Sequence, residues 1–126
     1  MPTEIKQLAD TELDEFVEFP YTLFRGHPQW IGELKKDTKK LLSISHPFWL
    51  HGERVLFMAY RDGQPAGRIA AIINRAHNSF HGENCGFFGF FDCEDNAETA
   101  RQLFFHAENY LRSEGMNLAV IPSVRR

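Results

Sequence analysis

The sequence predicts an α+β fold in which a mixed, mainly antiparallel sheet is flanked by layers of helices. Three observations support this prediction. From Glu53 the apolar pattern changes from helical spacing to the two-residue period of strands. Two strand-like runs meet at Asp62-Gly63, which is a strong signal for a two-residue hairpin turn. A helical pattern ending at Gly115 then separates two further strand-like runs, so the predicted order is β-α-α-β-β-β-α-β.

The amino-terminal third predicts one strand and two helices. Residues 3–8 alternate polar and apolar side chains, as a short strand does. Asp10 or Thr11 can cap the following helix, which Pro20 interrupts or kinks. A second helical pattern runs from about Trp30 to Leu42. Its lysines form a basic face, which is either a solvated surface or a site for an anion or a partner: Lys35, Lys36, Lys39 and Lys40.

Three strand-like runs follow, from Val55 to Arg61, from Ala66 to Asn74 and from Cys85 to Cys93. Gly67 interrupts the second run, where a missing side chain marks a bulge or a close approach of another backbone. A polar connection through Asn78 joins the second run to the third, and we expect it to be a loop.

The third run contains four phenylalanines. Strand pleating predicts Phe88 and Phe90 on one face and Phe87 and Phe91 on the other. Since both faces then carry large apolar side chains, the run is expected to be a central strand covered on both sides.

The last helix and strand complete the predicted order. Asp95 or Asn96 can cap a helix that runs to about Glu114, and the run from Met116 to Ile121 is expected to be a strand. The helix carries one apolar face: Ala100, Leu103, Phe104, Ala107, Tyr110 and Leu111.

Length and composition predict one domain, residues 1–126, with a real core. The 17 acidic and 14 basic residues give a formal charge of −3, which excludes the broad basic footprint of a nucleic-acid-binding protein. No apolar run is long enough to span a membrane. The polar amino terminus has no signal-peptide core, so we expect a cytoplasmic protein that binds neither nucleic acid nor membrane.

Neither cysteine is expected to be a nucleophile or to form a disulfide. Cys85 and Cys93 lie eight residues apart in one extended run, too far along a strand to bond each other. Cys93 has the acidic neighbours Asp92 and Glu94, which raise the pKa of a thiol. The sequence also lacks a Gly-x-Ser-x-Gly elbow and a phosphate-binding Gly-Lys loop.

A metal site is the alternative for one histidine cluster. His77, His81 and Cys85 recur every four residues with Glu83 between them, which on one continuous helix would place them on one face. Gly82 breaks such a helix, so we expect polar loop residues and no metal.

A general base for amine chemistry has three candidates, namely His51, Glu53 and Glu83. Each of these is equally a surface polar residue, and His46 resembles His51 in flanking an aromatic segment. No catalytic residue is assigned from the sequence.

Three segments, FPYTLFRGHPQW, LFMAYRDGQPAGRIAAIINRAHNSFHGE and GFFGFFDCEDNAETARQLFFHAENYLRSEGM, resemble the GNAT superfamily of acyl-CoA N-acyltransferases. More narrowly, they are similar to the amino-terminal part of a group of uncharacterised bacterial GNAT-like proteins. The resemblance extends from about Glu12 to Met116. It implies an acyl-CoA donor, such as acetyl-CoA, and an amine acceptor.

The resemblance also implies where acyl-CoA binds. In GNAT enzymes the fourth strand splays from the fifth and pairs with the pantetheine arm, and the next helix presents its amino terminus to the pyrophosphate. The side chains and backbone expected there are Phe90, Phe91, Asp92, Cys93, Asn96 and Ala97. Exposed N–H groups and the helix dipole make such an end an anion site.

This sequence departs from the family's Arg/Gln-x-x-Gly-x-Gly/Ala loop. Asp95 stands where Arg or Gln is expected and Glu98 stands at the middle glycine, while Ala100 fits. These acids either only cap the helix or border a modified CoA site, because carboxylates favour the dipole but repel a diphosphate.

GNAT domains also continue past the fifth strand with a helix and two strands, which we expect to be missing here because the sequence ends at Arg126. The chain would then be a truncation, or a second copy would cover the exposed sheet edge in a homodimer. The predicted function is an acyl-CoA-dependent N-acyltransferase, or a fragment of one. The alternative is a non-catalytic GNAT-like binding module with a degenerate CoA site.

Overall fold

The computed structural model describes residues 3–26 and 35–120. Its helices and strands follow in the order β1 (Thr3–Gln7), η1 (Asp10–Glu12), α1 (Leu13–Leu23), α2 (Lys35–Leu42), η2 (Pro47–Leu50), β2 (Gly52–Arg61), β3 (Gln64–Asn74), α3 (Arg75–His81), β4 (Cys85–Cys93), α4 (Ala97–Ser113) and β5 (Leu118–Val120). Residues 30–34 of the predicted second helix and Ile121 of the predicted last strand lie outside the described ranges.

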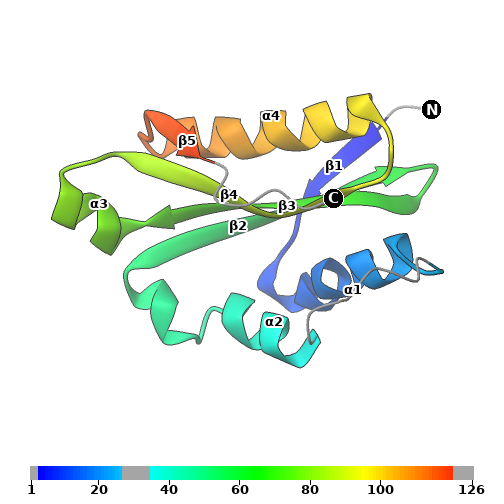
Figure 1. The fold of residues 1–126 in the computed structure, drawn as a ribbon, viewed down its shortest axis with the longest axis horizontal. Coiled ribbons are helices and arrows are strands. Elements are labelled where there is room, and N and C mark those ends of the chain that lie inside the picture. Colours follow the sequence, from blue (N-terminus) through cyan, green and yellow to red (C-terminus); the bar gives the residue numbers. More distant parts are fainter. Residues whose placement is uncertain (1–2, 27–34, 121–126) are drawn as a thin grey trace.

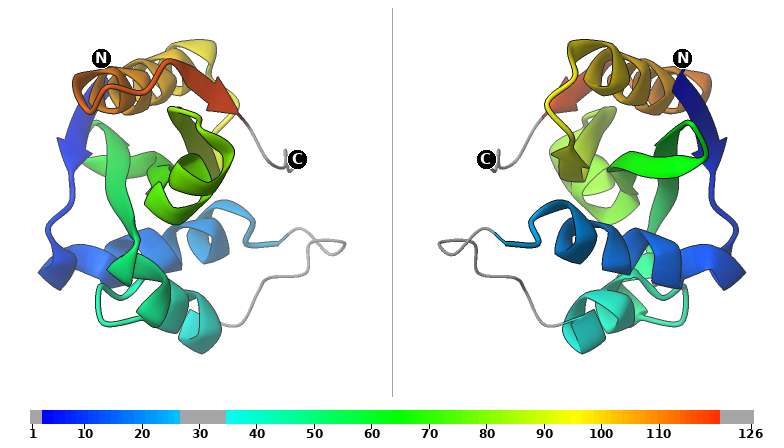
Figure 2. Two further views of the ribbon diagram at one scale, coloured as in Figure 1. Left: turned by 90° about the vertical axis from the view of Figure 1, so that its left-hand side faces the viewer. Right: turned by 90° about the vertical axis from the view of Figure 1, so that its right-hand side faces the viewer.

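The five strands form one sheet in the order β1-β2-β3-β4-β5, and its neighbours are antiparallel except for the parallel pair β4 and β5. Helix α4 covers one face of the sheet, whereas α1 and α2 cover the other (Figure 1). The views along the sheet in Figure 2 show the same separation of layers. The α+β prediction and its layered, mainly antiparallel arrangement are confirmed. Within the described ranges, no helix has the length and apolar content needed to cross a bilayer.

Each face of the sheet has its own core. On one side Leu103, Ala107 and Leu111 of α4 pack against strand residues such as Ile69 and Phe88. The predicted apolar face of α4 therefore lies on the sheet. The second core joins α1, α2 and the opposite face of the sheet, with these fully buried large side chains: Phe16, Leu42, Leu56 and Met58. Full burial of one such side chain contributes about 1.5–3 kcal/mol.

The predicted hairpin joins β2 and β3. Asp62 has a φ of 53° and Gly63 a φ of 76°, which are the left-handed values that a type I′ turn requires at both central positions. Gly67 lies beside a bulge of β3, because the register shifts between Ala59 opposite Gly67 and Tyr60 opposite Pro65. A Cβ atom at Gly67 would also meet the Leu103 side chain of α4 at 2.6 Å. Both predictions are confirmed.

The connection after β3 is a helix, so the loop prediction for this segment was wrong. The Asn74 side chain accepts the N–H of His77 at 2.9 Å and caps α3, which ends at Gly82 with a φ of 65°. Asn78 is the buried residue of α3, and its amide bonds both the N–H and the carbonyl of Cys85. A seven-residue helix held by polar contacts has no apolar stripe, which is why the sequence pattern did not reveal it.

Strand β4 contains a bulge at Phe90. Phe90 and Phe91 together lie opposite the single residue Ile69 of β3, and Phe90 has a φ of 53°. The prediction that Phe88 and Phe90 share a face was therefore wrong. Phe88 and Phe91 pack with the α4 core, whereas Phe90 packs with the core of the opposite face. The extra residue shifts the alternation of side chains by one position.

Candidate functional site

Among the residues that the structure describes, strand β4 is paired over only part of its side away from β3. The parallel pairing with β5 extends from Cys85 opposite Leu118 to Phe87 opposite Val120, the last described residue. In the part of the chain that the structure describes, nothing pairs with that side of β4 from Phe88 to Cys93. We call this stretch the open edge of β4. It includes the bulge and runs directly toward the start of α4 (Figure 1).

A buried ion pair between Arg68 of β3 and Asp92 of β4 lies next to the bulge. Arg68 is 2% exposed, and its Nη2 lies 2.8 Å from Oδ2 of Asp92. Its Nη1 donates to the carbonyl of Phe16 at 2.9 Å, and the guanidinium lies over the rings of Phe16 and Phe90. The carboxylate of Asp92 is thus held by Arg68, which stands opposite it on β3.

Sequence reasoning missed Arg68. Its signal was a single charged residue within the apolar run AGRIAAI of β3. A charged residue is buried in a sheet only when it has a partner. That partner, Asp92, lies 24 residues away on the neighbouring strand.

The amino terminus of α4 follows the open edge. The Asn96 side chain accepts the N–H of Thr99 at 3.0 Å, so it caps the helix. Among the described residues, no acceptor takes the main-chain N–H groups of Ala97 and Glu98. These two donors and the positive end of a 17-residue helix form the anion-attracting end that the resemblance implies.

Two of the three acidic residues near this end are neutralised. Glu94 pairs with Arg61 of β2 at 2.6 Å, and Glu98 pairs with Arg101 of its own helix. Asp95 is exposed and has no partner within the described ranges. The sequence suggested that all three carboxylates would repel a diphosphate. Since Glu94 and Glu98 have cationic partners, Asp95 is the main remaining source of this repulsion.

Cys93, at the end of the open edge, is half-buried. Burial raises the pKa of its thiol to about 11, and the charges of Glu94 and Asp92 contribute further. The predicted direction of this shift is confirmed, although burial is a larger cause than the acidic neighbours. Cys85 and Cys93 are both free thiols.

We expect Cys93 to react slowly with thiol reagents. With a pKa of about 11, about one thiol in a thousand is ionised at pH 8. The rate with a disulfide reagent, measured on a Cys85→Ser variant, should be about a hundredfold below that of free cysteine. It should rise toward pH 11 and become normal in urea. A rate equal to that of free cysteine in the folded chain would contradict the buried thiol.

The three candidate bases lie at the other end of the sheet. Glu53 stands opposite Ile73, whereas Cys93 stands opposite Gly67 of the same strand. Six residues of strand separate these positions, or about 20 Å. His51 immediately precedes β2, and Glu83 lies just before β4. The structure therefore does not bring these bases together with the start of α4.

Two of these bases, Glu53 and Glu83, already have hydrogen-bond partners in the fold. The Nε of Arg75 donates to Glu53 at 2.9 Å, and this hydrogen bond is the main reason that the pKa of Glu53 is lowered. Tyr110 also donates to Glu53 at 3.3 Å. Glu83 lies 2.9 Å from Nε2 of His77. A carboxylate with a lowered pKa is a weak proton acceptor near neutral pH.

We expect Glu53→Gln to lower the free energy of unfolding at pH 7 by less than about 1 kcal/mol, because the Glu53–Arg75 pair is exposed to solvent. The pKa of Glu53 is lower in the folded chain, so its contribution is present above the unfolded pKa and lost as the pH falls through the folded one. In urea titrations, the difference between variant and parent should be larger at pH 7 than at pH 3. An equal difference at both values would contradict this assignment.

The histidine cluster of the sequence lies on and after α3. The rings of His77 and His81 are 4.4 Å apart, while Cys85 is buried at the start of β4. In the described part of the chain, no three His, Cys, Asp or Glu side chains converge on a common metal position.

Comparison with curated proteins finds two bacterial relatives. The chain is 33% identical over 108 residues to "Protein YghO" of Escherichia coli, which covers 86% of this chain and 28% of that protein. It is 36% identical over 113 residues to "Bacterial ceramide synthase" of Caulobacter vibrioides, which covers 88% of this chain and 29% of that protein. The chain thus spans less than a third of the length of these relatives. No family model matches the chain.

Comparison with solved structures finds acetyltransferases. An acetyltransferase of the GNAT family from Staphylococcus aureus has a TM-score of 0.68 at 12% identity, covering 98% of this chain and 74% of that chain. A predicted acetyltransferase with acetyl-CoA from Clostridium acetobutylicum has a TM-score of 0.69 at 10% identity, covering 98% and 82%. The aminoglycoside acetyltransferase meta-AAC0020, from an uncultured soil sample, has a TM-score of 0.68 at 12% identity, covering 98% and 78%. The fold that the sequence resemblance implied is confirmed.

Proposed function

We propose that this chain, which has the GNAT fold, is the acyl-CoA-binding part of an N-acyltransferase. The observation that supports this best is the open edge of β4, which contains the Phe90 bulge and leads to the amino terminus of α4. In GNAT enzymes the corresponding edge pairs with the pantetheine arm, and the helix that follows receives the pyrophosphate. The open edge comes directly before the start of α4 in the chain, just as the pantetheine arm adjoins the pyrophosphate in CoA.

The proposed contacts are mainly with the main chain. Backbone groups of Phe90, Phe91 and Cys93 would pair with the amide groups of pantetheine through the open edge. Asp92 would support this edge, since it stands opposite Arg68 of β3 and its carboxylate binds that side chain. The side chain of Asn96 caps α4, and its own N–H donates to the carbonyl of Glu94 at 2.7 Å, so Asn96 would position the helix end. Ala97 would offer its N–H to the pyrophosphate. A strand edge with a free row of donors and acceptors suits a ligand that itself carries two amides.

The proposed reaction is direct acyl transfer. An unprotonated amine attacks the thioester carbonyl and a C–N bond forms. The C–S bond then breaks, the nitrogen loses one proton, and the CoA thiolate leaves and takes one proton. Backbone N–H groups at the bulge would stabilise the negative charge that develops on the carbonyl oxygen. The amine and thiolate partners for proton transfer are not assigned to side chains of this chain.

The acceptor that we propose is a long-chain amino alcohol. A ceramide contains an amide made by N-acylation of such an amine, and the Caulobacter relative bears the name of a ceramide synthase. Its sequence is similar over the region of this chain that contains the open edge and α4. In a protein more than three times longer, the remaining part would provide the rest of the acceptor site.

The alternative function is a binding module without catalysis. Asp95 favours this alternative, because its exposed carboxylate precedes the helix end where the pyrophosphate would lie. Such a module would bind a partner or an apolar molecule and have no affinity for acyl-CoA.

Calorimetric titration with acetyl-CoA separates the two proposals. We expect binding by the 126-residue chain, and tighter binding by Asp95→Asn because the variant removes a repelling charge. The matched control is Asp62→Asn, which removes the same charge at the tip of the hairpin. No heat at millimolar acetyl-CoA with either variant or parent would overturn the proposal of a CoA site.

A thioester assay tests the acceptor. We expect free thiol to be released from acyl-CoA with a long-chain amino alcohol more rapidly than with a short amine, in the longer relatives that contain this region. Release that does not depend on the amine would identify a hydrolase. Binding of CoA without release by any form would retain the CoA site and overturn the proposed transfer.

A further inference from the structure

We propose that the surface formed by residues 35–50, comprising α2, η2 and the turn between them, binds the surface of an anionic phospholipid membrane. We call it the α2–η2 surface. It belongs to the layer on the face of the sheet opposite α4 (Figure 1), so it is separate from the start of α4 where the CoA pyrophosphate is proposed to bind. The proposal adds a partner to the function above and does not depend on it.

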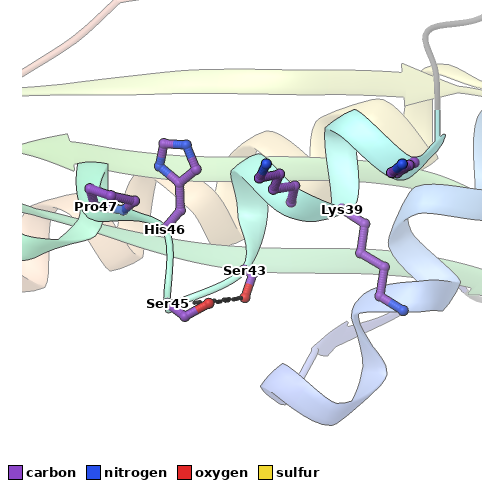
Figure 3. Close-up of a pocket in the computed structure, with 7 residues that line it drawn as sticks. Lys39, Ser43, Ser45, His46 and Pro47 are labelled. Atoms are coloured by element: carbon purple, nitrogen blue, oxygen red, sulfur yellow. Dashed lines mark hydrogen bonds between the residues drawn. The ribbon is translucent and has the colours of Figure 1, made fainter.

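A hollow of about 370 Å³ lies in this surface (Figure 3). Its lining consists of amines, hydroxyls, a ring nitrogen and one proline: Lys36, Lys39, Lys40, Ser43, Ser45, His46 and Pro47. The hydroxyls of Ser43 and Ser45 bond each other at 3.0 Å, and Nδ1 of His46 accepts the N–H of Phe48. No described residue that lines the hollow carries a carboxylate, and most of its exposed lining is apolar, so the hollow suits an amphipathic headgroup better than a bare phosphate.

The lysines of α2 divide into two pairs. Lys35 binds Glu18 and Lys39 binds Asp14, both at 2.8 Å, and these ion pairs join α2 to α1. Figure 3 shows the Lys39 side chain extending toward α1. The first pair of lysines is therefore engaged in the fold.

The second pair, Lys36 and Lys40, is available to a ligand. These residues lie one helical turn apart and are exposed, and no carboxylate of the described residues pairs with either. Residues 35–50 contain four lysines and one aspartate, a formal charge of +3, although the whole chain has a charge of −3. Asp14 and Glu18 of α1 offset two of these lysines, so with them and Asp37 counted the surface has an excess of one positive charge. Among the described residues, the lysines of this surface without a carboxylate partner are Lys36 and Lys40, and their charge complements an anionic surface.

Large apolar side chains lie exposed beside these lysines. Six large hydrophobic residues are exposed in the described ranges, and four of them belong to this one segment: Leu41 (40%), Ile44 (61%), Phe48 (39%) and Leu50 (79%). The indole N–H of Trp49 donates to the carbonyl of Leu41 at 2.8 Å, which holds η2 against the end of α2. The segment that carries the exposed apolar side chains is thereby fixed to the helix that carries the lysines.

A membrane accommodates this combination better than a protein partner does. Apolar side chains can enter the boundary between headgroups and acyl chains while lysine amines remain among the phosphates. Burial against protein would instead desolvate the lysines, which are depleted in protein interfaces. The structure thus favours anionic phospholipid as the occupant.

Flotation of the 126-residue chain with lipid vesicles tests this proposal. We expect binding to phosphatidylcholine vesicles that contain phosphatidylglycerol, weaker binding at high salt, and none to pure phosphatidylcholine. Lys36→Gln with Lys40→Gln should weaken binding about thirtyfold, as expected for two lysines at a charged surface. The matched control is Arg101→Gln with Arg112→Gln, which removes the same charge from α4 and should leave binding unchanged.

A second pair of variants tests the apolar contribution. Ile44→Ser with Leu50→Ser should abolish flotation, whereas Phe80→Ser with Phe105→Ser, the two exposed aromatic side chains outside the segment, should not. Circular dichroism and titration with acetyl-CoA in every variant report the fold and the CoA site separately, so failure of one proposal is distinguishable from failure of the other.

Three results would overturn the proposal. The first is equal flotation of the lysine variant and its α4 control. The second is binding of inorganic phosphate in solution without binding to vesicles, which would identify a small-anion site. The third is a dimer in sedimentation that Ile44→Ser with Leu50→Ser dissociates, which would identify an interface between copies.

Discussion

Replacing Arg68 by methionine is expected to lower the free energy of unfolding by about 3–5 kcal/mol. Methionine fills much of the volume of the arginine stem, but it leaves the Asp92 carboxylate without its buried cation. It also leaves the carbonyl of Phe16 without the N–H that Arg68 donates at 2.9 Å. Uncompensated buried charge is among the most costly changes in a folded protein. Urea unfolding followed by circular dichroism measures the loss.

The control is Arg112→Met on α4. Arg112 pairs with Glu108 within one helix, and its side chain is 68% exposed. We expect a loss of about 0.5 kcal/mol or less there, because exposed pairs contribute little. The double variant Arg68→Met with Asp92→Leu should recover part of the loss, since it removes both charges together. An Arg68→Met variant no less stable than Arg112→Met would show that the buried pair does not stabilise the fold.

The predictable parts of this fold are those that neighbouring residues determine. Asp62 and Gly63 specify a type I′ turn by their own conformational preferences, and the turn then sets the pairing of β2 with β3. The strand-like run predicted from Cys85 to Cys93 has the same bounds as β4 of the structure. The cap of α4 at Asn96 likewise depends on a local hydrogen bond to Thr99.

The parts that escaped prediction depend on contacts between distant segments. Nothing in GFFGFFDC marks Phe90 as the extra residue of a bulge. Its place follows from the pairing of Arg68 with Asp92 and from the packing of its ring on Phe16. Since a bulge reverses the alternation of side chains, one missed residue placed two phenylalanines on the wrong faces.

At the candidate site, too, local features could be predicted from the sequence, whereas contacts between distant residues could not. The sequence located the open edge and the start of α4 through the family resemblance, and it located the acidic residues near that start. It did not indicate that Arg61 neutralises Glu94, because the two residues lie 33 positions apart. The electrostatic environment of the proposed CoA site therefore differs from what the local run CEDNAE suggests.

Deleting Phe90 is expected to abolish binding of acetyl-CoA. Without this residue, Phe91 alone lies opposite Ile69, Arg68 still pairs with Asp92, and β4 becomes a regular strand. The bulge changes the directions of the backbone groups at the open edge, and its loss should lower the affinity at least about tenfold, since main-chain contacts would supply much of the binding. Calorimetric titration measures the change.

Phe90→Ala is the matched control, because it removes the same ring but keeps the number of residues in β4. Both variants lose the contact of Phe90 with Phe16, whose ring centroids are 6.3 Å apart, so both should lose similar stability. Only the deletion removes the bulge. We expect Phe90→Ala to bind acetyl-CoA within a few-fold of the parent. Equal loss in both variants would assign the effect to the ring, and unchanged binding by the deletion variant would show that the bulge is not part of the acyl-CoA site.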